Sequence, residues 1–222
     1  MTAADKTIIA YFDMDRTVLR DSSGMLYMRY LRGHGMVDWR AMLTAYWYAA
    51  LYKLGLLSYP DASSKLASTV SHDSEAEQRL FCQRCFDDLM VNYVSSEAVQ
   101  RINDHRSWGH RVTIISASTS YVVGPLARHL GISDYLCTRL EVADGRFTGR
   151  IVQPACYGPG KVHWASDHAH RLGARLADSY FYSDSYSDLA LLEHVGQPVA
   201  VNPDARLKAH AVRHGWPIEY FH

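Results

Sequence analysis

The chain alternates between short apolar runs and segments with helical periodicity, and this alternation limits the folds that it can adopt. Each apolar run has the length of a buried parallel strand and ends in polar residues. Strands that alternate with helices predict an α/β fold with a doubly wound, Rossmann-like parallel sheet. The predicted strands are Thr7–Phe12, Arg111–Ile115, Tyr180–Tyr182 and Pro198–Val201, and the predicted helices are Thr119–Leu130, Lys161–Leu172 and Asp204–His214.

One stretch departs from this alternation. Residues Leu140–Ile151 hold Asp144-Gly145 between two strand-like runs, and an Asp-Gly pair in that position is a strong signal for a two-residue turn. We therefore expect a small antiparallel β-hairpin beside the sheet.

A long segment without strand pattern separates the first apolar run from the second. From Asp21 to about Glu97 the sequence is helical, with breaks near Gly33-His34-Gly35, Ser58-Tyr59-Pro60 and Ser71-His72-Asp73. This favours a helical cap inserted after the first strand. We expect a core domain formed by residues 1–20 and 98–222 and a helical cap formed by residues 21–97.

Size and charge narrow the classes of function. The chain has 222 residues, of which 48% are hydrophobic, so it can form one main core with a small accessory lobe. Lys+Arg and Asp+Glu balance at 23 each, so we expect a small-molecule partner and no nucleic acid. Four cysteines and an N-terminus without a signal-peptide pattern indicate a cytoplasmic protein. We expect either a monomer or a homodimer.

Four polar clusters follow the predicted strands or open a predicted helix. In an open α/β sheet the carboxyl ends of the strands share one edge, where ligands bind. We expect the clusters to meet there. They are Asp13-Met14-Asp15-Arg16-Thr17, Ser116-Ala117-Ser118, Gly158-Pro159-Gly160-Lys161 and Ser183-Asp184-Ser185-Tyr186-Ser187-Asp188.

These residue types predict magnesium-dependent phosphoryl transfer. Carboxylates in a cluster repel one another unless a hard cation neutralises them, and Mg²⁺ prefers oxygen ligands. The cation also screens the incoming phosphate, so that Asp13 can attack phosphorus. Asp15 is then the acid/base candidate. The ammonium of Lys161 and the hydroxyl of Ser116 would hold the phosphate oxygens, and we expect Thr17 to hydrogen-bond within the loop.

Each cluster also has an ordinary structural interpretation. Asp-x-Asp pairs are common in turns and caps, Ser116 could cap the next helix, and Lys161 could be a surface lysine. Asp184 and Asp188 could serve the N-terminus of a helix that begins near Ser185. The order of the four clusters along the chain favours the catalytic interpretation.

With these residues, the sequence resembles the haloacid dehalogenase-like (HAD) superfamily, subfamily IB, whose phosphoserine-phosphatase-like members carry a helical cap after the first motif. The resemblance spans nearly the whole chain. Its four motifs correspond to Phe12–Leu19, Ile115–Ser118, Lys161 and Tyr182–Leu189.

The resemblance implies a role for each motif residue. Asp13 is the nucleophile, which forms an aspartyl phosphate, and Asp15 is the acid/base. The implied Mg²⁺ ligands are Asp13, Asp15 through its carbonyl, and Asp184, with Asp188 supporting the metal directly or through water. The expected phosphate-binding residues are Ser116, Ala117, Lys161 and Thr17.

One agreement with the phosphatase pattern and one departure from it, both in the region of the first motif, bear on the reaction. Dehalogenases that resemble this chain lack the second acid of the first motif, so Asp15 favours phosphomonoester hydrolysis. Phosphoserine phosphatases place a glutamate shortly after this motif to bind the substrate amine, whereas this chain has Asp21-Ser22-Ser23. We therefore expect a small phosphorylated metabolite as substrate, without assigning phosphoserine.

An aromatic stretch leaves other functions open. Trp39–Leu57 contains Arg40 and Lys53 and fits a buried or interfacial helix better than a membrane span. Its apolar arc could pack within the cap, form a dimer contact or touch lipid; the arc comprises Tyr46, Trp47, Tyr48, Leu51 and Tyr52. Lipid contact would favour a phospholipid headgroup substrate, such as phosphatidylglycerophosphate or a lysolipid phosphate. The remaining alternative is a catalytically idle protein that binds phosphorylated metabolites.

Three further motifs receive no functional role. Cys82-Gln83-Arg84-Cys85 has no second pair at metal-ligand spacing, so we expect reduced structural thiols. His163, His168 and His170 lie on a presumed surface helix, where we expect them to be solvated. Gly158–Lys161 lacks the glycine and Ser/Thr positions of a nucleotide-binding P-loop.

Overall fold

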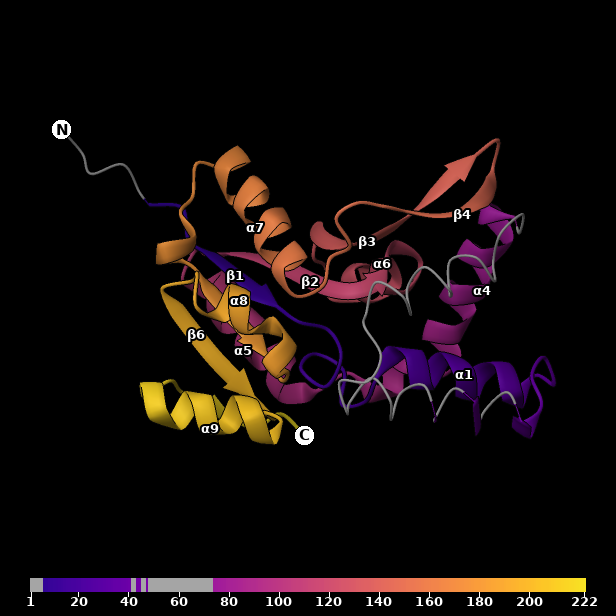
Figure 1. Cartoon of the computed structure of the whole chain (residues 1–222), viewed down its shortest axis with the longest axis horizontal. Helices are drawn as coiled ribbons and strands as arrows, with labels where there is room; N and C mark the ends of the chain where they lie inside the picture. Colours follow the sequence, from indigo (N-terminus) through magenta and orange to yellow (C-terminus); the bar gives the residue numbers. More distant parts are fainter. Residues whose placement is uncertain (1–5, 41–42, 45–46, 48–73) are drawn as a thin grey trace.

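The computed structural model describes residues 6–40, 43–44, 47 and 74–222. A central sheet has the strand order β4-β3-β2-β1-β5-β6-β7, in which all neighbours pair in parallel except β3 and β4. The predicted doubly wound α/β fold with an added hairpin is confirmed (Figure 1). The strands are β1 (Ile9–Phe12), β2 (Arg111–Thr119), β3 (Asp134–Ala143), β4 (Arg146–Val152), β5 (Tyr180–Ser183), β6 (Gln197–Val201) and β7 (Ile218–Glu219).

Helices cover both faces of the sheet. Side chains alternate along β1, so that Ala10 and Phe12 pack with residues of α5 and α6, whereas Ile9 and Tyr11 pack with residues of α7, α8 and α9. All four side chains are fully buried, as the continuous apolar run requires. The helices are α5 (Ser96–Ser107), α6 (Ser120–His129), α7 (Pro159–Arg171), α8 (Leu189–Leu192) and α9 (Ala205–His214).

The predicted hairpin is confirmed, but the first half of its strand β3, which belongs to the parallel sheet, was not predicted. The first part of β3 pairs in parallel with β2, from Asp134 to Thr138, and the second part pairs antiparallel with β4. A single strand thus serves both pairings, whereas the sequence pattern indicated a hairpin outside the sheet. The short edge strand β7 was also missed, since it has only two residues.

The inserted segment contains helices α1 (Ser23–Gly33) and α4 (Glu75–Asp88) among its described residues. The two connections to the core run side by side, because Arg20 N donates to Tyr93 O over 2.8 Å and Ser95 N donates to Val18 O over 2.9 Å. Helix α4 also reaches the hairpin, where Glu75 N donates to Gly145 O over 2.9 Å. The boundaries proposed for core and cap remain a prediction.

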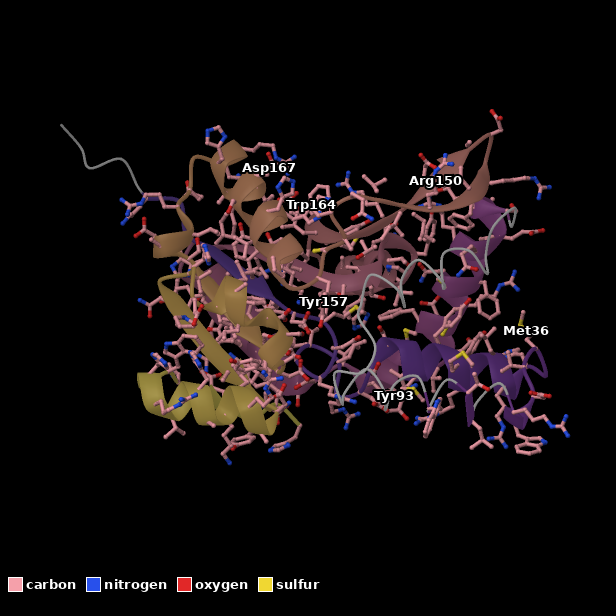
Figure 2. All side chains as sticks on the ribbon, viewed as in Figure 1. Met36, Tyr93, Arg150, Tyr157, Trp164 and Asp167 are labelled. Carbon is pink, nitrogen blue, oxygen red and sulfur yellow. The ribbon has the colours of Figure 1, made fainter. Side chains whose placement is uncertain are left out.

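Most of the aromatic stretch Trp39–Leu57, for which packing, a dimer contact or lipid contact was expected, lies outside the described residues. No helix in the described part of the chain combines the length and the apolarity needed to cross a membrane. Figure 2 places Met36 far from the sheet, beyond the end of α1, and its side chain is exposed.

The expectation of solvated histidines on α7 is wrong for His168. This side chain is buried, and its Nδ1 lies 3.1 Å from the hydroxyl of Tyr11 on β1. His168 shares the buried face of α7 with Lys161, Ala165 and Ala169, because these positions are separated by helical spacing. His163 and His170 are exposed, as expected.

The prediction for the cysteine pair is confirmed. Cys82 and Cys85 are free thiols, and both are buried on the inner face of α4. Burial raises the pKa of each thiol to about 12.

Candidate active site

The register of the sheet brings three motif residues to one edge. Phe12 pairs with Ile114 of β2 on one side and with Tyr182 of β5 on the other. Asp13, Ser116 and Asp184 therefore follow at the carboxyl ends of three adjacent parallel strands. Neighbouring strands in a sheet lie about 4.8 Å apart, so the side chains can face a common ligand.

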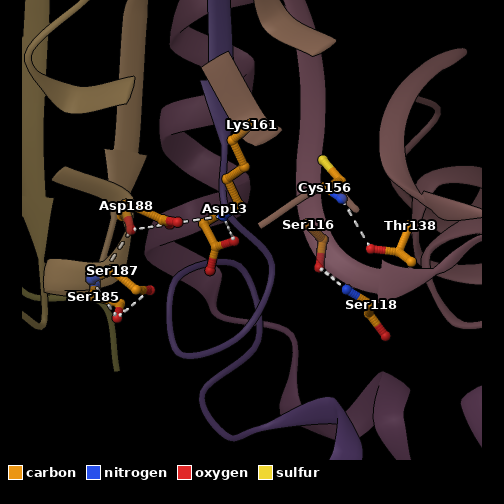
Figure 3. A network of polar contacts seen from close by, with 10 residues as sticks. Asp13, Ser116, Ser118, Thr138, Cys156, Lys161, Ser185, Ser187 and Asp188 are labelled. Atoms are coloured by element: carbon orange, nitrogen blue, oxygen red, sulfur yellow. Dashed lines mark hydrogen bonds and ion pairs between the residues drawn. The ribbon is translucent and has the colours of Figure 1, made fainter. Parts of the chain in front are cut away.

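Lys161 links two of the acidic motifs by ion pairs. Its Nζ lies 2.6 Å from Asp13 Oδ1 and 2.7 Å from Asp188 Oδ2 (Figure 3). The hydroxyl of Ser183 also donates to Asp188 Oδ2, over 2.6 Å. All four residues are buried. The interpretation of Lys161 as a surface lysine is therefore wrong. Asp188 does stand at the N-cap of the short helix α8, but its side chain makes no capping hydrogen bond and pairs with Lys161 instead.

Burial and charge set the protonation of this cluster. Burial raises the pKa of Asp13 to about 7, against the charge of Lys161, and the carboxylates of Asp188 and Asp15 add to the rise. Burial also raises the pKa of Asp184 to about 8, with further contributions from Asp13 and Asp188. Burial alone would lower the pKa of Lys161, but its two carboxylate partners outweigh that effect and raise it. The site thus contains more negative than positive charge and can accept a cation.

Ser116 lies in the last part of β2, next to the strand that leads to Asp13. It is buried, and its Oγ accepts a hydrogen bond from Ser118 N over 3.1 Å. Because that contact uses Oγ as acceptor, the hydroxyl proton can be donated to a phosphate oxygen. Ser116 does not cap the next helix, whose N-cap residue is Thr119.

Asp15 is oriented by the start of helix α1. Its Oδ1 accepts a hydrogen bond over 2.8 Å from the backbone N–H of Ser23, the first residue of α1. Burial raises the pKa of Asp15, and the hydrogen bond from Ser23 opposes that rise. A raised pKa favours the protonated form of a carboxyl, which is the form that a general acid needs.

The predicted hydrogen bond of Thr17 within the loop is wrong. Thr17 is buried, and its Oγ1 has no hydrogen-bond partner among the residues that the structure describes. Its role in phosphate binding, like that of Ala117, remains a prediction.

Asp13, Asp15 and Asp184 offer oxygen donors, which are the ligands that Mg²⁺ prefers. Within the described residues, no group of three His, Cys, Asp or Glu side chains is arranged to hold a metal. Mg²⁺ needs fewer protein ligands, since it is commonly bound by one or two carboxylates together with waters and substrate phosphate. Burial, and then neighbouring carboxylates, raise the pKa of Asp13 and of Asp184, and a cation bound between them would oppose both effects.

Two residues that support the site were not predicted. A Cβ on Gly160 would lie 1.9 Å from the carbonyl oxygen of Ala155, so the start of α7 can reach this place only without a side chain. Asp204 N donates to Asp184 O over 2.8 Å, and Asp204 Oδ2 accepts from Tyr186 N over 2.8 Å. Asp204 follows strand β6, so inspection of every strand end would have found it.

The comparison with known proteins agrees with this geometry. The sequence profile of the haloacid dehalogenase-like hydrolases matches residues 10–193, which include all four motifs. This chain belongs to the HAD-like hydrolase family. The family predicted from the motifs is confirmed.

Three similar proteins extend the comparison. A phosphoserine phosphatase of Mycobacterium tuberculosis is 32% identical, over 98% of this chain and 72% of its own length. A histidinol-phosphatase of Neisseria meningitidis serogroup C is 30% identical, over 96% of this chain and 98% of its own length. A crystal structure of a Bordetella pertussis protein of unknown function has a TM-score of 0.86 and 29% identity, and covers 96% of this chain and 98% of that one. The HAD-like chain is a phosphatase, as its motifs predicted.

Proposed function

We propose that this HAD-like phosphatase hydrolyses the phosphate monoester of a small metabolite in a Mg²⁺-dependent reaction that passes through a phosphorylated Asp13. The observation that carries the proposal is the buried ion pair of Asp13 with Lys161 at the carboxyl edge of the sheet. The ammonium of Lys161 orients the carboxylate of Asp13. Strand β2, which carries the Ser116 hydroxyl, pairs with the strand that leads to Asp13.

The first step transfers the phosphoryl group to the enzyme. A bond forms between a carboxylate oxygen of Asp13 and phosphorus, the ester P–O bond breaks, and Asp15 gives its proton to the departing oxygen. Lys161 and the Ser116 hydroxyl stabilise the charge on the phosphoryl oxygens. The hydrogen bond from Ser23 keeps the Asp15 carboxyl oriented during this transfer.

The second step releases phosphate. Asp15 takes a proton from a water molecule, which attacks phosphorus, and the bond between phosphorus and Asp13 breaks. Asp13, Asp184 and the carbonyl of Asp15 would hold the Mg²⁺ ion, with Asp188 acting mainly by fixing Lys161. When bound, Mg²⁺ supplies positive charge that offsets the repulsion between the carboxylate and the phosphate.

Substrate choice is the least constrained part of the proposal. One relative is named for phosphoserine and another for histidinol phosphate. This chain has Asp21-Ser22-Ser23 where phosphoserine phosphatases carry the glutamate that binds the substrate amine, so phosphoserine is not singled out as the substrate. Turnover should be measured on a panel that contains phosphoserine, histidinol phosphate and sugar phosphates.

Kinetics with p-nitrophenyl phosphate test the chemistry. The substitution Asp13→Asn should reduce Mg²⁺-dependent turnover at least about a thousandfold, since it removes the nucleophile. Asp15→Asn should still form a phosphoenzyme but should slow its breakdown by about a hundred- to ten-thousandfold. Asp167→Asn, which alters an exposed carboxylate of α7, is the matched control. Full turnover by the Asp13 variant, or phosphate binding without turnover by the wild type, would contradict the proposal.

An exposed apolar row favours a lipid phosphate as a second candidate substrate. Met36, Trp39, Leu43 and Trp47 are 59%, 57%, 57% and 65% exposed, respectively. Exposed tryptophan rings and apolar side chains such as these suit the interface of a membrane. Flotation with anionic liposomes should then recover the wild type but not a Trp39→Ser/Trp47→Ser variant. Absence of the wild type from the liposome fraction removes this candidate.

A further inference from the structure

The loop that carries the two catalytic aspartates has a strained turn. Arg16, which directly follows Asp15, has φ of 55°, in the left-handed region that non-glycine residues rarely occupy. The turn around it is tight, since Val18 N and Leu19 N both donate to Met14 O, over 3.0 and 2.8 Å. A residue in this conformation persists only where neighbouring groups hold it.

Asn202 supplies such a hold from the end of β6. Its Nδ2 donates to the carbonyl oxygen of Arg16 over 3.0 Å and to that of Phe221 over 2.8 Å. Its Oδ1 accepts from Phe221 N over 3.1 Å. The backbone contacts fix the orientation of the amide, because the N–H of Phe221 must face an oxygen and the two carbonyls must face a donor. One side chain therefore joins the catalytic loop, the end of β6 and the segment after β7.

The conformation of Asn202 suits this task. Its φ is 44°, also in the left-handed region, which asparagine tolerates better than most residues. Its own N–H donates to Glu219 O over 2.9 Å, so the backbone at this position is fixed as well. Asparagine is thus the residue that combines this backbone conformation with two donors and one acceptor.

We propose that Asn202 is a positioning residue that holds the turn at Arg16 and thereby keeps Asp15 in place for proton transfer. This inference rests on the proposed function of Asp13 and Asp15. Asp13 has anchors of its own, since its N–H donates to Tyr182 O over 2.9 Å and its carboxylate pairs with Lys161. The carboxylate of Asp15 is held by the N–H of Ser23, but its backbone leads directly into the turn at Arg16 that Asn202 binds. Loss of the Asn202 amide therefore affects the acid/base more than the nucleophile.

This difference can be measured with two esters of similar shape. p-Nitrophenyl phosphate has a good leaving group that needs little protonation, whereas phenyl phosphate depends on the general acid. In Asn202→Gly, which keeps the left-handed backbone accessible, kcat/KM for phenyl phosphate should fall about ten- to a hundredfold, because kcat/KM reports the steps through phosphoenzyme formation. kcat/KM for p-nitrophenyl phosphate should fall much less, whereas kcat can fall for both esters because they share the breakdown of the phosphoenzyme. Asn202→Asp should show the same pattern, since an oxygen would replace the donor that faces two carbonyls.

Asp144→Gly is the matched control, because Asp144 is another left-handed non-glycine residue and lies in the turn between β3 and β4. It should leave both kcat/KM values unchanged. Thermal unfolding of each variant separates positioning from stability. Unchanged kcat/KM in both folded Asn202 variants overturns the inference, and so does an equal loss of kcat/KM on both esters. If neither variant folds, Asn202 is a structural residue and the inference also fails. Equal activity of wild type and Asp15→Asn on phenyl phosphate would instead contradict the proposed function itself.

Discussion

Lys161 and Asp13 form an ion pair inside the protein, with Lys161 Nζ 2.6 Å from Asp13 Oδ1 and the lysine side chain only 2% exposed. Asp188 completes the arrangement by binding the same ammonium. A buried charge is tolerated only when it is paired, so each member of this group depends on the other two. The same ion pairs therefore stabilise the fold and hold the proposed nucleophile in place.

Replacement of Lys161 should damage both stability and activity. In Lys161→Met, Asp13 and Asp188 lose their counter-charge, and a broken buried pair costs about 3–5 kcal/mol. We expect this loss in urea unfolding at pH 7.5, together with loss of phosphatase activity. Lys208→Met, at an exposed position of α9, should change neither. A Lys161→Met protein as stable as wild type would contradict the structural account of the pair.

Asp184 should control the response to magnesium. A ligand that binds only the folded state raises the melting temperature, so Mg²⁺ should stabilise the wild type. Asp184→Asn should remove most of this shift. Without Mg²⁺ the variant should be at least as stable as wild type, because Asp13 and Asp188 no longer repel a charge at this position. Asp167→Asn should keep the full shift, and an undiminished shift in Asp184→Asn would exclude Asp184 as a ligand.

His105 should make the stability of the protein depend on pH. The ring is fully buried, with Nε2 2.8 Å from the hydroxyl of Tyr182 and Nδ1 2.8 Å from Nδ1 of His110. Burial lowers the pKa of His105 to about 4, and the neighbouring charge of His110 contributes. The unfolded chain protonates this ring below its ordinary pKa of about 6.5, whereas the folded protein does so only near pH 4.

Stability should therefore fall as pH falls through this window, by about 1.4 kcal/mol per pH unit from this group. Between pH 7 and pH 4.5 the wild type should lose about 2–3 kcal/mol more than His105→Gln in urea unfolding. His163→Gln, on the exposed face of α7, should behave as wild type. Parallel losses in wild type and His105→Gln would contradict the role given to His105.

The four cysteines should be unreactive in the folded protein. All are free and buried, and burial raises the pKa of Cys82, Cys85 and Cys137 to about 12 and also raises that of Cys156. The thiolate is the reactive form, so a thiol reagent should label four groups in urea and essentially none in buffer. Ser166→Cys, at an exposed position of α7, should add one rapidly labelled group. Rapid labelling of the native wild type would show that one of these thiols is accessible.

The motifs and their order along the chain could be read from the sequence because each depends on local pattern. An apolar run that ends in Asp13 predicts a buried strand with an acid at its tip, and the register of β1 with β2 and β5 places that acid as expected. The predicted helices Lys161–Leu172 and Asp204–His214 differ from α7 and α9 by at most two residues at either end.

Contacts between distant segments could not be read in the same way. The depth of His168 depends on which face of α7 meets the sheet, and the missing hydrogen bond of Thr17 depends on how the loop turns at Arg16. Asn202 lies 186 positions from the carbonyl that it binds. No local spacing encodes such a pair.

The sequence by itself determined the fold class, the family and the residue types at the edge of the sheet, because strand periodicity and short motifs are local properties of the chain. Only the tertiary structure decided which charges neutralise one another and which amide holds the catalytic loop. Those relationships arise when packing removes water from side chains that are far apart in sequence, so that each buried polar group must find a partner wherever the fold places one.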